Sequence, residues 1–387
     1  MVRSKNTRKR EVCLTLVGLG LAATIFAILI SYLSGLDKKS SPLPFEEIYA
    51  PSEQLGKYIC LIDKAISDGF YKMGVPEEKI IFLSVVPRHK DGYTWDFNSI
   101  EARIPHHHSV FEIGEEISSR ISNLGIPVQI NIDKEAGNKI IYDIYYKDFY
   151  THKLGIVSDT YQPRHRLSYP RIGIIIDDLG YDGSLAKAFM KIDLPLTFSV
   201  LPFTPNTRLI ALRARKEGRE TMLHLPMEPI NYPAINPGDG VLLVSMDKEM
   251  ILEILNRDLS HIPFVAGVNN HMGSRFTENE EKMTIVLAEL KARGLYFIDS
   301  RTSGNSVAFR VARKMALRAA CRDIFLDNDL SDNAISRQME RLLSLARHKG
   351  WAIGIGHPHK ETLKILKRYM LTLNNETEIV PISNLVN

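Results

Sequence analysis

From Arg171 onward, nearly continuous apolar runs alternate with segments of helical periodicity. Apolar runs of this kind are typical of parallel strands that are buried on both faces. Seven strands are predicted, within RIGIIID, PLTFSVLP, ETMLHLP, FVAGVNN, LYFIDS, DIFLDND and AIGIGHP. The helical segments are SLAKAFMKI, NTRLIALRARKEG, MDKEMILEILNRDL, EEKMTIVLAELKARG, SVAFRVARKMALRAA, SRQMERLLSLARHKG and KETLKILKRYM, and a short strand in EIVPIS follows them. These repeated strand–helix units predict an α/β domain in residues 170–387, with a parallel sheet and outer helices.

Residues 49–153 have a different pattern. Helical spacing occurs in SEQLGKYICLIDKAISDGFYKMG and SVFEIGEEISSRISNLG, and strands are predicted in KIIFLSVVPR and YTWDFNSIEARI. The stretches PVQINID and KIIYDIYYKDFYTHKLGIV alternate like the arms of a hairpin around KEAGN. The order of helix, two strands, helix and two strands predicts a small α+β module. The consecutive histidines His106–His108 precede a predicted N-cap at Ser109, and we interpret them as a solvated loop.

The N-terminal apolar run, Val12–Leu33, contains no charged residue. At about 1.5 Å per residue it is long enough to cross a bilayer core of about 30 Å. Basic residues cluster in the tail of residues 1–11, so the positive-inside rule predicts a cytoplasmic N-terminus and an exported remainder. We therefore expect a transmembrane signal anchor at 12–33, with a cleaved signal peptide as the alternative. The polar stretches 34–48 and 154–169 are predicted linkers.

Composition and charge narrow the function classes. The formal net charge is only +4, and the basic N-terminal tail contributes to it. The sequence contains neither a basic stripe interleaved with aromatic residues nor a recognition motif, so we expect no nucleic-acid partner. The three cysteines are scattered, which predicts neither a disulfide framework nor a zinc knuckle.

Polar clusters follow almost every predicted strand of residues 170–387 at its C-terminal end. They are Asp177-Asp178, His224, Asn269-Asn270-His271, Asp299-Ser300-Arg301, Asp327-Asn328-Asp329 and His357-Pro358-His359. Active sites of closed parallel barrels are built from C-terminal strand ends, whereas an open doubly wound sheet binds its ligands at a switch point. The distribution of the clusters therefore favours a barrel over an open sheet.

The first two clusters contain candidate metal-site residues. Adjacent carboxylates such as Asp177 and Asp178 repel each other unless a cation or a proton lies between them. Beside a metal ion, one of them can ligate while the other accepts a proton from water; capping of the next helix is the alternative role. His224 ends a strand and is expected to be a ligand. Glu228, four residues later, is either a site residue or a solvated loop acid.

The later clusters add a ligand and supporting groups. His271 is a candidate ligand, and its neighbours Asn269 and Asn270 are expected to orient ligands or to bind a polar substrate. His357 is the predicted general acid, because imidazole titrates near neutral pH. The further candidates are Asp299 and Arg301 for an ion pair or substrate contacts, Asp327 for orienting a histidine, and His359 for a substrate contact or the start of the last helix.

Asp178, His224 and His271 together offer one carboxylate and two imidazoles. This set suits Zn²⁺ with an open coordination position. An additional aspartate and histidine supply a base and an acid, which predicts metal-assisted hydrolysis of an amide or an ester. The sequence has no Gly-x-Ser-x-Gly elbow, no phosphate loop and no dinucleotide fingerprint.

Six stretches, in this order, closely resemble the divergent polysaccharide deacetylase family. They are IIIDDLGY, HLPMEP, GVNNHMGSRFT, FIDSRTSGNSVA, IFLDND and IGIGHPHKETL, and the resemblance covers about residues 171–386. It implies a relationship to the NodB-type polysaccharide deacetylases and a distorted (β/α)7-type barrel. It also implies a metal-dependent hydrolase that removes N- or O-acetyl groups from sugars. The anchor and the α+β module lie outside the resemblance.

The resemblance also implies residue roles. An Asp-Asp motif of the wider group supplies a base and then a metal ligand, and it falls on Asp177 and Asp178. A His-x-x-x-His motif with two ligands corresponds to His224–Glu228, so an acid replaces its second histidine, and either His271 or Glu228 is the third ligand. The general acid corresponds to His357. The Arg-Pro loop of the wider group has no clear counterpart, and NNHMGSR stands about where it would be.

The expected function is therefore that of a Zn²⁺-dependent deacetylase of envelope or extracellular glycans. The expected location is the bacterial inner (cytoplasmic) membrane, with a single span, the N-terminus inside and the catalytic domain extracytoplasmic. Expected partners are an acetylated glycan, the membrane through the N-terminal helix, and a protein of the envelope. The alternatives are an inactive barrel that binds glycan or a partner, and an amidase acting on cell-wall peptide.

Overall fold

The computed structural model describes residues 53–105, 109–136, 138–159 and 169–386. The predicted basic tail, anchor and first linker, together with His106–His108, lie outside these ranges. Among the helices within them, none is both long and apolar enough to cross a bilayer.

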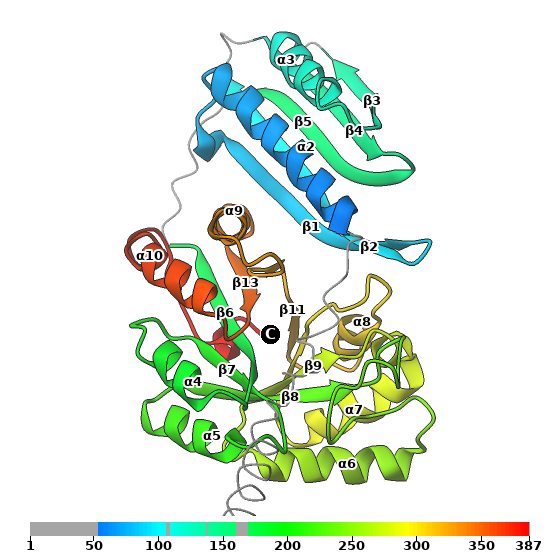
Figure 1. Cartoon of the computed structure of the whole chain (residues 1–387), viewed down its shortest axis with the longest axis vertical. Coiled ribbons are helices and arrows are strands. Elements are labelled where there is room, and N and C mark those ends of the chain that lie inside the picture. The colour runs from blue at the N-terminus through cyan, green and yellow to red at the C-terminus, as the bar shows by residue number, and fades with distance from the viewer. Residues whose placement is uncertain (1–52, 106–108, 137, 160–168, 387) are drawn as a thin grey trace, which may run out of the picture. The chain divides into compact units, whose positions relative to one another are not determined.

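The α+β module has two helices on one face of a five-stranded sheet (Figure 1). The sheet order is β1-β2-β5-β4-β3, in which only β2 and β5 run parallel. Apolar residues of α2 and α3 and of the facing strand positions form its core. The elements are α2 (Glu53–Lys72), β1 (Ile80–Lys90), β2 (Tyr93–Pro105), α3 (Val110–Ser122), β3 (Val128–Ala136), β4 (Lys139–Tyr146) and β5 (Phe149–Asp159).

The last part of the module differs from the predicted hairpin. The segment KIIYDIYYKDFYTHKLGIV forms two strands, β4 and β5, because the chain turns between them at Lys147, whose φ is +51°. The alternation of apolar residues continues through this turn, so the pattern alone gave no sign of it. β5 then runs beside β2 and continues to Asp159, into the stretch that was expected to be a linker.

Residues 169–386 form the α/β domain, with helices around a parallel sheet (Figure 1). The strand order is β11-β10-β9-β8-β7-β6-β13-β12, and β14 pairs with β6. The strands are β6 (Arg171–Leu179), β7 (Thr197–Val200), β8 (Glu220–Met227), β9 (Gly267–Met272), β10 (Tyr296–Asp299), β11 (Ala319–Cys321), β12 (Ile324–Phe325), β13 (Trp351–Gly356) and β14 (Glu378–Ile379). The helices are α4 (Gly183–Met190), α5 (Thr207–Lys216), α6 (Lys248–His261), α7 (Glu280–Ala292), α8 (Ala308–Lys314), α9 (Asp332–Lys349) and α10 (Lys360–Glu376).

The apolar strand runs fill two separate cores. Ile174 and Ile176 on β6 pack into the cluster shared with the outer helices, whereas Ile175 between them belongs to a smaller cluster on the other face. That smaller cluster also takes in Ile382 and Leu385 near the C-terminus. Both faces of the strand are therefore buried, which explains its continuous hydrophobicity. The polar residues lie at the C-terminal ends of the strands.

The sheet is a half-barrel rather than the expected closed one. Its order ends at β11 and β12, and among the described strands these two do not pair. They are joined by only Arg322 and Asp323. Arg322 is buried there, where its guanidinium donates to the carbonyl oxygen of Ser300 at 2.7 Å and lies 3.6 Å from the ring centroid of Phe325.

One predicted helix is shorter than expected. The segment SVAFRVARKMALRAA was predicted to be helical throughout, but α8 ends at Lys314. Ala319–Cys321 instead pair with Phe297–Asp299 as edge strand β11. Alanine favours a helix in isolation, and here pairing with the sheet overrides that preference.

The module and the α/β domain meet through a buried ion pair. Asp63 on α2 binds the guanidinium of Arg341 on α9, and His152 Nε2 lies 3.1 Å from the same carboxylate. Burial alone would raise the pKa of Asp63, but Arg341 and His152 outweigh it and lower the pKa to about 2. A second contact joins α9 to β1, since the backbone N–H of Phe82 donates to Ser344 Oγ at 3.2 Å.

Candidate metal centre

The end of β6 presents two successive carboxylates to one site. In a regular strand, adjacent side chains point to opposite faces. The register between β6 and β7 shifts between Ile176 and Leu179, and Asp178 has a φ of +52°. This irregularity redirects the chain, so that Asp178 Oδ1 lies 3.0 Å and Asp177 Oδ2 3.9 Å from the same imidazole nitrogen, His224 Nε2.

Strands β8 and β9 supply two histidines on one face. His224 is paired in register with Asn269, and His271 lies two residues further along β9, so all three side chains share a face. The chain can turn sharply after His271 because Gly273 has a φ of +85°. A Cβ atom at Gly273 would also lie 2.6 Å from Met227 Cβ, so glycine is required by space as well as by conformation.

Three buried donor atoms converge in this site. Asp178 Oδ1 lies 3.0 Å from both His224 Nε2 and His271 Nδ1, and the two nitrogens are 3.2 Å apart. Tetrahedral coordination with bonds of about 2.1 Å requires ligand atoms roughly 3.4 Å apart. The triangle is therefore close to one face of a tetrahedral metal site, and these three residues form a buried group able to hold a metal ion.

The surroundings of Asp178 also fit a cation. Neither of its buried oxygens has a hydrogen-bond partner among the described residues. Burial alone would raise the pKa of Asp178, but His271 and His224 hold it well below its usual range. A buried carboxylate that stays ionised needs a positive partner, and two imidazole nitrogens directed at it are suitable co-ligands.

Asn269 connects the base candidate to the metal ligands. Its Nδ2 donates to both oxygens of Asp177, each at 2.9 Å. That contact orients the amide so that its Oδ1 faces His224 Nδ1 at 3.0 Å. An amide oxygen only accepts hydrogen bonds, so His224 carries its proton on Nδ1 and directs the Nε2 lone pair toward Asp178 and His271.

We expect Asn269→Ala to lower the affinity for Zn²⁺ by about 10- to 100-fold, because His224 loses the acceptor that holds its tautomer. Isothermal titration calorimetry with Zn²⁺ on the metal-depleted full-length protein measures this effect. Asn270→Ala is the matched control, since Asn270 bonds to Met272, Ser300 and Thr302 and not to the donor group. Equal losses in the two variants would contradict the assigned role of Asn269.

His357 and Asp327 form a second pair at neighbouring strand ends. His357 Nδ1 lies 2.8 Å from Asp327 Oδ1, and the backbone N–H of His357 donates to Asp327 Oδ2 at 2.6 Å. Burial alone would raise the pKa of Asp327, but His357 lowers it below the usual value. A carboxylate oxygen only accepts hydrogen bonds, so His357 carries a proton on Nδ1 and its Nε2 is directed away from Asp327.

The structure brings His357 to the strand that adjoins the carboxylates. Gly356 is paired in register with Ile176, so His357 and Asp177 are the next residues on adjacent strands. His359 begins α10 without a side-chain capping bond, and burial lowers its pKa. It lies at the edge of the site rather than with the donor group.

Glu228 does not join the donor group. Its Oε1 accepts from Arg275 at 2.9 Å, and its Oε2 accepts from the backbone N–H of Val244 at 2.5 Å. Of the two candidates for the third ligand, the structure therefore places His271 with Asp178 and His224.

The loop that follows β10 is held by hydrogen bonds that involve Asn270, Asp299 and the backbone of Arg301. Asn270 Oδ1 accepts from the backbone N–H of Ser300 at 2.9 Å. Asp299 accepts from the backbone N–H of Arg301 at 2.9 Å and from Ser306 Oγ at 2.8 Å. Asp299 thus contacts the Arg301 backbone, and the expected ion pair between the two side chains stays a prediction.

Sequence reasoning missed two hydroxyl residues of the site, Ser199 and Thr362, and gave Ser300 of the Asp299-Ser300-Arg301 cluster no role. Ser199 near the end of β7 donates to Asn269 Oδ1 at 2.6 Å, and Ser300 Oγ accepts from Asn269 Nδ2 at 3.2 Å. Thr362 on α10 donates to Asp327 Oδ2 at 2.5 Å. Ser199 could have been identified from the sequence because it is a polar residue within an apolar strand run. Thr362 could not, because a threonine in an amphipathic helix is not unusual.

Comparisons with known proteins identify relatives of the α/β domain. The sequence profile of the family described as divergent polysaccharide deacetylase matches residues 174–386. The uncharacterised protein YibQ of Escherichia coli K12 is 33% identical over 217 residues, which cover 56% of this chain and 67% of YibQ. An uncharacterised protein of Haemophilus influenzae Rd is 32% identical over 215 residues, covering 56% and 76% of the two chains.

The fold of the α/β domain is also similar to a solved structure. The crystal structure of an uncharacterised protein from Agrobacterium tumefaciens C58 has a TM-score of 0.55 and 27% sequence identity to this chain. The alignment covers 58% of this chain and 92% of the other.

Proposed function

This chain belongs to the divergent polysaccharide deacetylase family, and we propose that it is a metal-dependent hydrolase that removes acetyl groups from a glycan. The observation that carries the proposal is the triangle of Asp178 Oδ1, His224 Nε2 and His271 Nδ1, with Asp177 held beside it. Zn²⁺ is the ion that one carboxylate and two imidazoles suit best. Such an ion, when bound, supplies a Lewis acid that polarises the acetyl carbonyl.

Asp177 is the general base of the proposed reaction. Both of its oxygens accept hydrogen bonds from Asn269, which fixes the plane of the carboxylate without placing a positive charge on it. It takes a proton from the attacking water as the water oxygen bonds to the acetyl carbon. Asn269 is a positioning residue, because it acts through Asp177 and His224.

His357 is the general acid. The bond from the acetyl carbon to the sugar nitrogen or oxygen breaks, and His357 Nε2 gives its proton to the leaving amine or alcohol. Asp327 holds the imidazole through Nδ1 and stabilises its protonated form. The strands that carry these two residues, β6 and β13, are adjacent, which supports their action on one group.

The proposal includes an extracytoplasmic location. The charge-free run at residues 12–33 behind a basic tail supports a single membrane span with the α+β module and the α/β domain exported. An acetylated glycan of the envelope is then the substrate class that the enzyme would meet.

Release of acetate tests the proposed function. We expect the full-length protein, purified in detergent and loaded with Zn²⁺, to release acetate from acetylated glucosamine oligomers, with a loss of at least about 100-fold after chelation. Cell-wall peptides are the parallel substrate, and release of amine from them would indicate an amidase instead. Metal binding without either product would favour the alternative of a glycan-binding protein that does not hydrolyse.

A further inference from the structure

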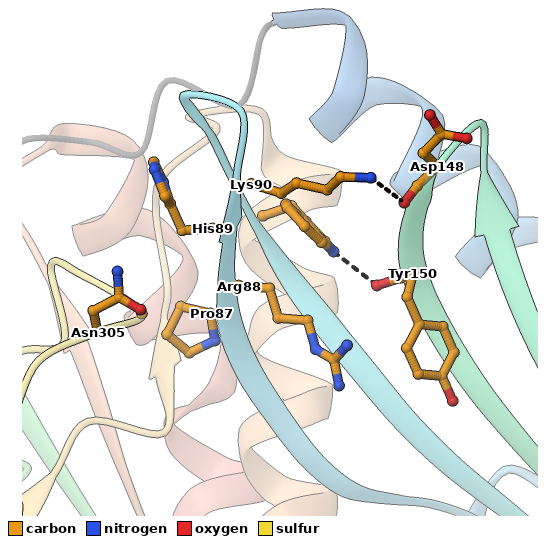
Figure 2. A pocket seen from close by; sticks show the side chains of 9 residues that line it. Pro87, Arg88, His89, Lys90, Asp148, Tyr150 and Asn305 are labelled. Atoms are coloured by element: carbon orange, nitrogen blue, oxygen red, sulfur yellow. Dashed lines mark hydrogen bonds between the residues drawn. The ribbon is translucent and has the colours of Figure 1, made fainter.

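A cavity of about 490 Å³ lies between the sheet of the module and the loop that joins β10 to α8. Its volume falls in the range of small-molecule sites. Figure 2 shows the side chains that line it, which come from β1, β2, the turn between β4 and β5, the start of β5 and the loop. They are Pro87, Arg88, His89, Lys90, Trp95, Asp148, Tyr150, Gly304 and Asn305. A Cβ atom at Gly304 would lie 3.0 Å from the carbonyl oxygen of Pro87, so the two walls are in close contact.

Arg88 is held in this cavity by aromatic rings instead of an acid. Its guanidinium lies 4.0 Å from the ring centroid of Phe97 and 4.8 Å from that of Tyr150. No carboxylate among the described residues forms an ion pair with it, and in Figure 2 the Asp148 carboxylate lies away from it. An arginine fixed in this way keeps its N–H donors in a defined plane, which suits bidentate binding of an oxyanion.

The other lining groups give the cavity positive charge and a rigid wall. Lys90 Nζ donates to the carbonyl oxygen of Asp148 at 3.4 Å, and it too has no acid partner among the described residues. Trp95 Nε1 donates to the carbonyl oxygen of Tyr150 at 2.9 Å, which fixes the indole. The lining contains two cations and a single acid, Asp148, whose carboxylate pairs with neither of them, so the cavity favours a negatively charged ligand.

We propose that this cavity binds a sugar unit that carries an oxyanion, such as a uronate. Arg88 pairs with the oxyanion, Lys90 adds attraction, and the exposed amide of Asn305 hydrogen-bonds ring hydroxyls. The glycan nature of the ligand rests on the proposed function, whereas the preference for negative charge rests on the cavity alone.

The cavity and the candidate metal centre share one loop. Ser300 accepts a hydrogen bond from Asn269 in the metal centre, and Asn305, five residues later, lines the cavity. Five residues of extended chain span at most about 18 Å. The two places are therefore near each other, and in this proposal the cavity serves as a distal subsite for an acidic glycan whose acetylated unit lies at the candidate metal centre.

Intrinsic fluorescence tests this proposal without any need for activity. The chain has two tryptophans, Trp95 and Trp351, so in a Trp351→Phe background the wall of the cavity carries the only fluorophore of this kind. We expect glucuronate to change the emission of the full-length protein saturably, and glucose to leave it unchanged at the same ionic strength. Arg88→Gln is expected to raise the Kd for glucuronate by at least about 10-fold, as loss of a charged hydrogen bond does.

Two further variants keep the test decisive. Arg103→Gln on β2 is the matched control, since Arg103 pairs with Glu101 and does not line the cavity, and it should leave the Kd unchanged. Asn305→Asp changes an exposed loop residue and is expected to weaken glucuronate binding by at least about 5-fold through charge repulsion. The change in Kd of Asn305→Asp can therefore be interpreted even if Arg88→Gln disturbs the sheet.

The opposite results would overturn the proposal. If glucuronate gave no saturable change in emission, or if glucose gave an equal change, the proposed binding site would be contradicted. Equal affinity for inorganic phosphate would show that the cavity recognises an anion without its sugar, and would overturn the assigned ligand. Failure of acetate release from the uncharged glucosamine oligomers bears on the proposed function alone, because glucuronate binding is measured without metal or turnover.

Discussion

Asp178→Asn is expected to lower the affinity for Zn²⁺ by more than about 100-fold, beyond the effect typical of an outer-shell change. The substitution keeps the shape of the side chain and removes the charge that two buried imidazoles face at 3.0 Å. Because the variant no longer binds the metal, acetate release should fall below detection. Calorimetric titration with Zn²⁺ and an acetate assay on the same preparation measure both effects.

Asp177→Asn is the matched variant one residue earlier. Its carboxylate lies 3.9 Å from His224 Nε2 and accepts from Asn269, so it is positioned as a base and not as a ligand. We expect metal affinity within a few-fold of the native protein and a loss of at least about 100-fold in kcat. If Asp177→Asn lost the metal while Asp178→Asn kept it, the two roles would have to be exchanged.

Asp63→Asn is expected to lower the free energy of unfolding by about 3–5 kcal/mol, since it leaves the buried guanidinium of Arg341 without its charged partner. Urea denaturation of the full-length protein measures the change. The control is Asp68→Asn on the same helix, where the ion pair with Lys64 is solvent-exposed and worth only about 0.3–0.5 kcal/mol. If both variants lost a similar free energy of unfolding, the buried ion pair would contribute no more to stability than the exposed one.

The same ion pair predicts a pH dependence of stability. The pKa of Asp63 is lowered to about 2 in the folded protein, whereas an unfolded aspartate titrates near about 3.9. The folded state therefore binds the proton less readily than the unfolded state does. The contribution of ionised Asp63 to the free energy of unfolding is fully present above the pKa that this residue has in the unfolded chain. It should disappear as the pH falls from about 4 through 2, and Asp63→Asn should show a smaller loss of stability over that range.

The position of the site was predictable because a parallel sheet gathers its C-terminal strand ends at one edge. Asp178, His224 and His271 follow three apolar runs in the sequence, and strand order alone brings such ends together. The irregular backbone at Asp178 was not predictable, because nothing in its residue type requires a positive φ. Both adjacent carboxylates reach the site only through that irregularity.

The choice between His271 and Glu228 also depended on contacts that spacing does not reveal. Glu228 stands four residues after His224 in a proline-containing stretch, where spacing does not determine direction. Its partners, Val244 and Arg275, lie 16 and 47 residues away. The α8–β11 boundary was missed for a similar reason, since Ala319–Cys321 become a strand only beside β10.

The two ends of the half-barrel, β11 and β12, differ mechanically from the rest of its wall. Every other neighbouring pair along the strand order is joined by ladder hydrogen bonds, which resist any change in circumference. Between β11 and β12 the wall is completed by Arg322, whose side chain reaches the loop after β10 and the ring of Phe325. Separation at this seam would break no ladder bond, but the two-residue connection Arg322–Asp323 keeps the ends of β11 and β12 close together, so the seam is held by chain connectivity and one side chain instead of by a ladder.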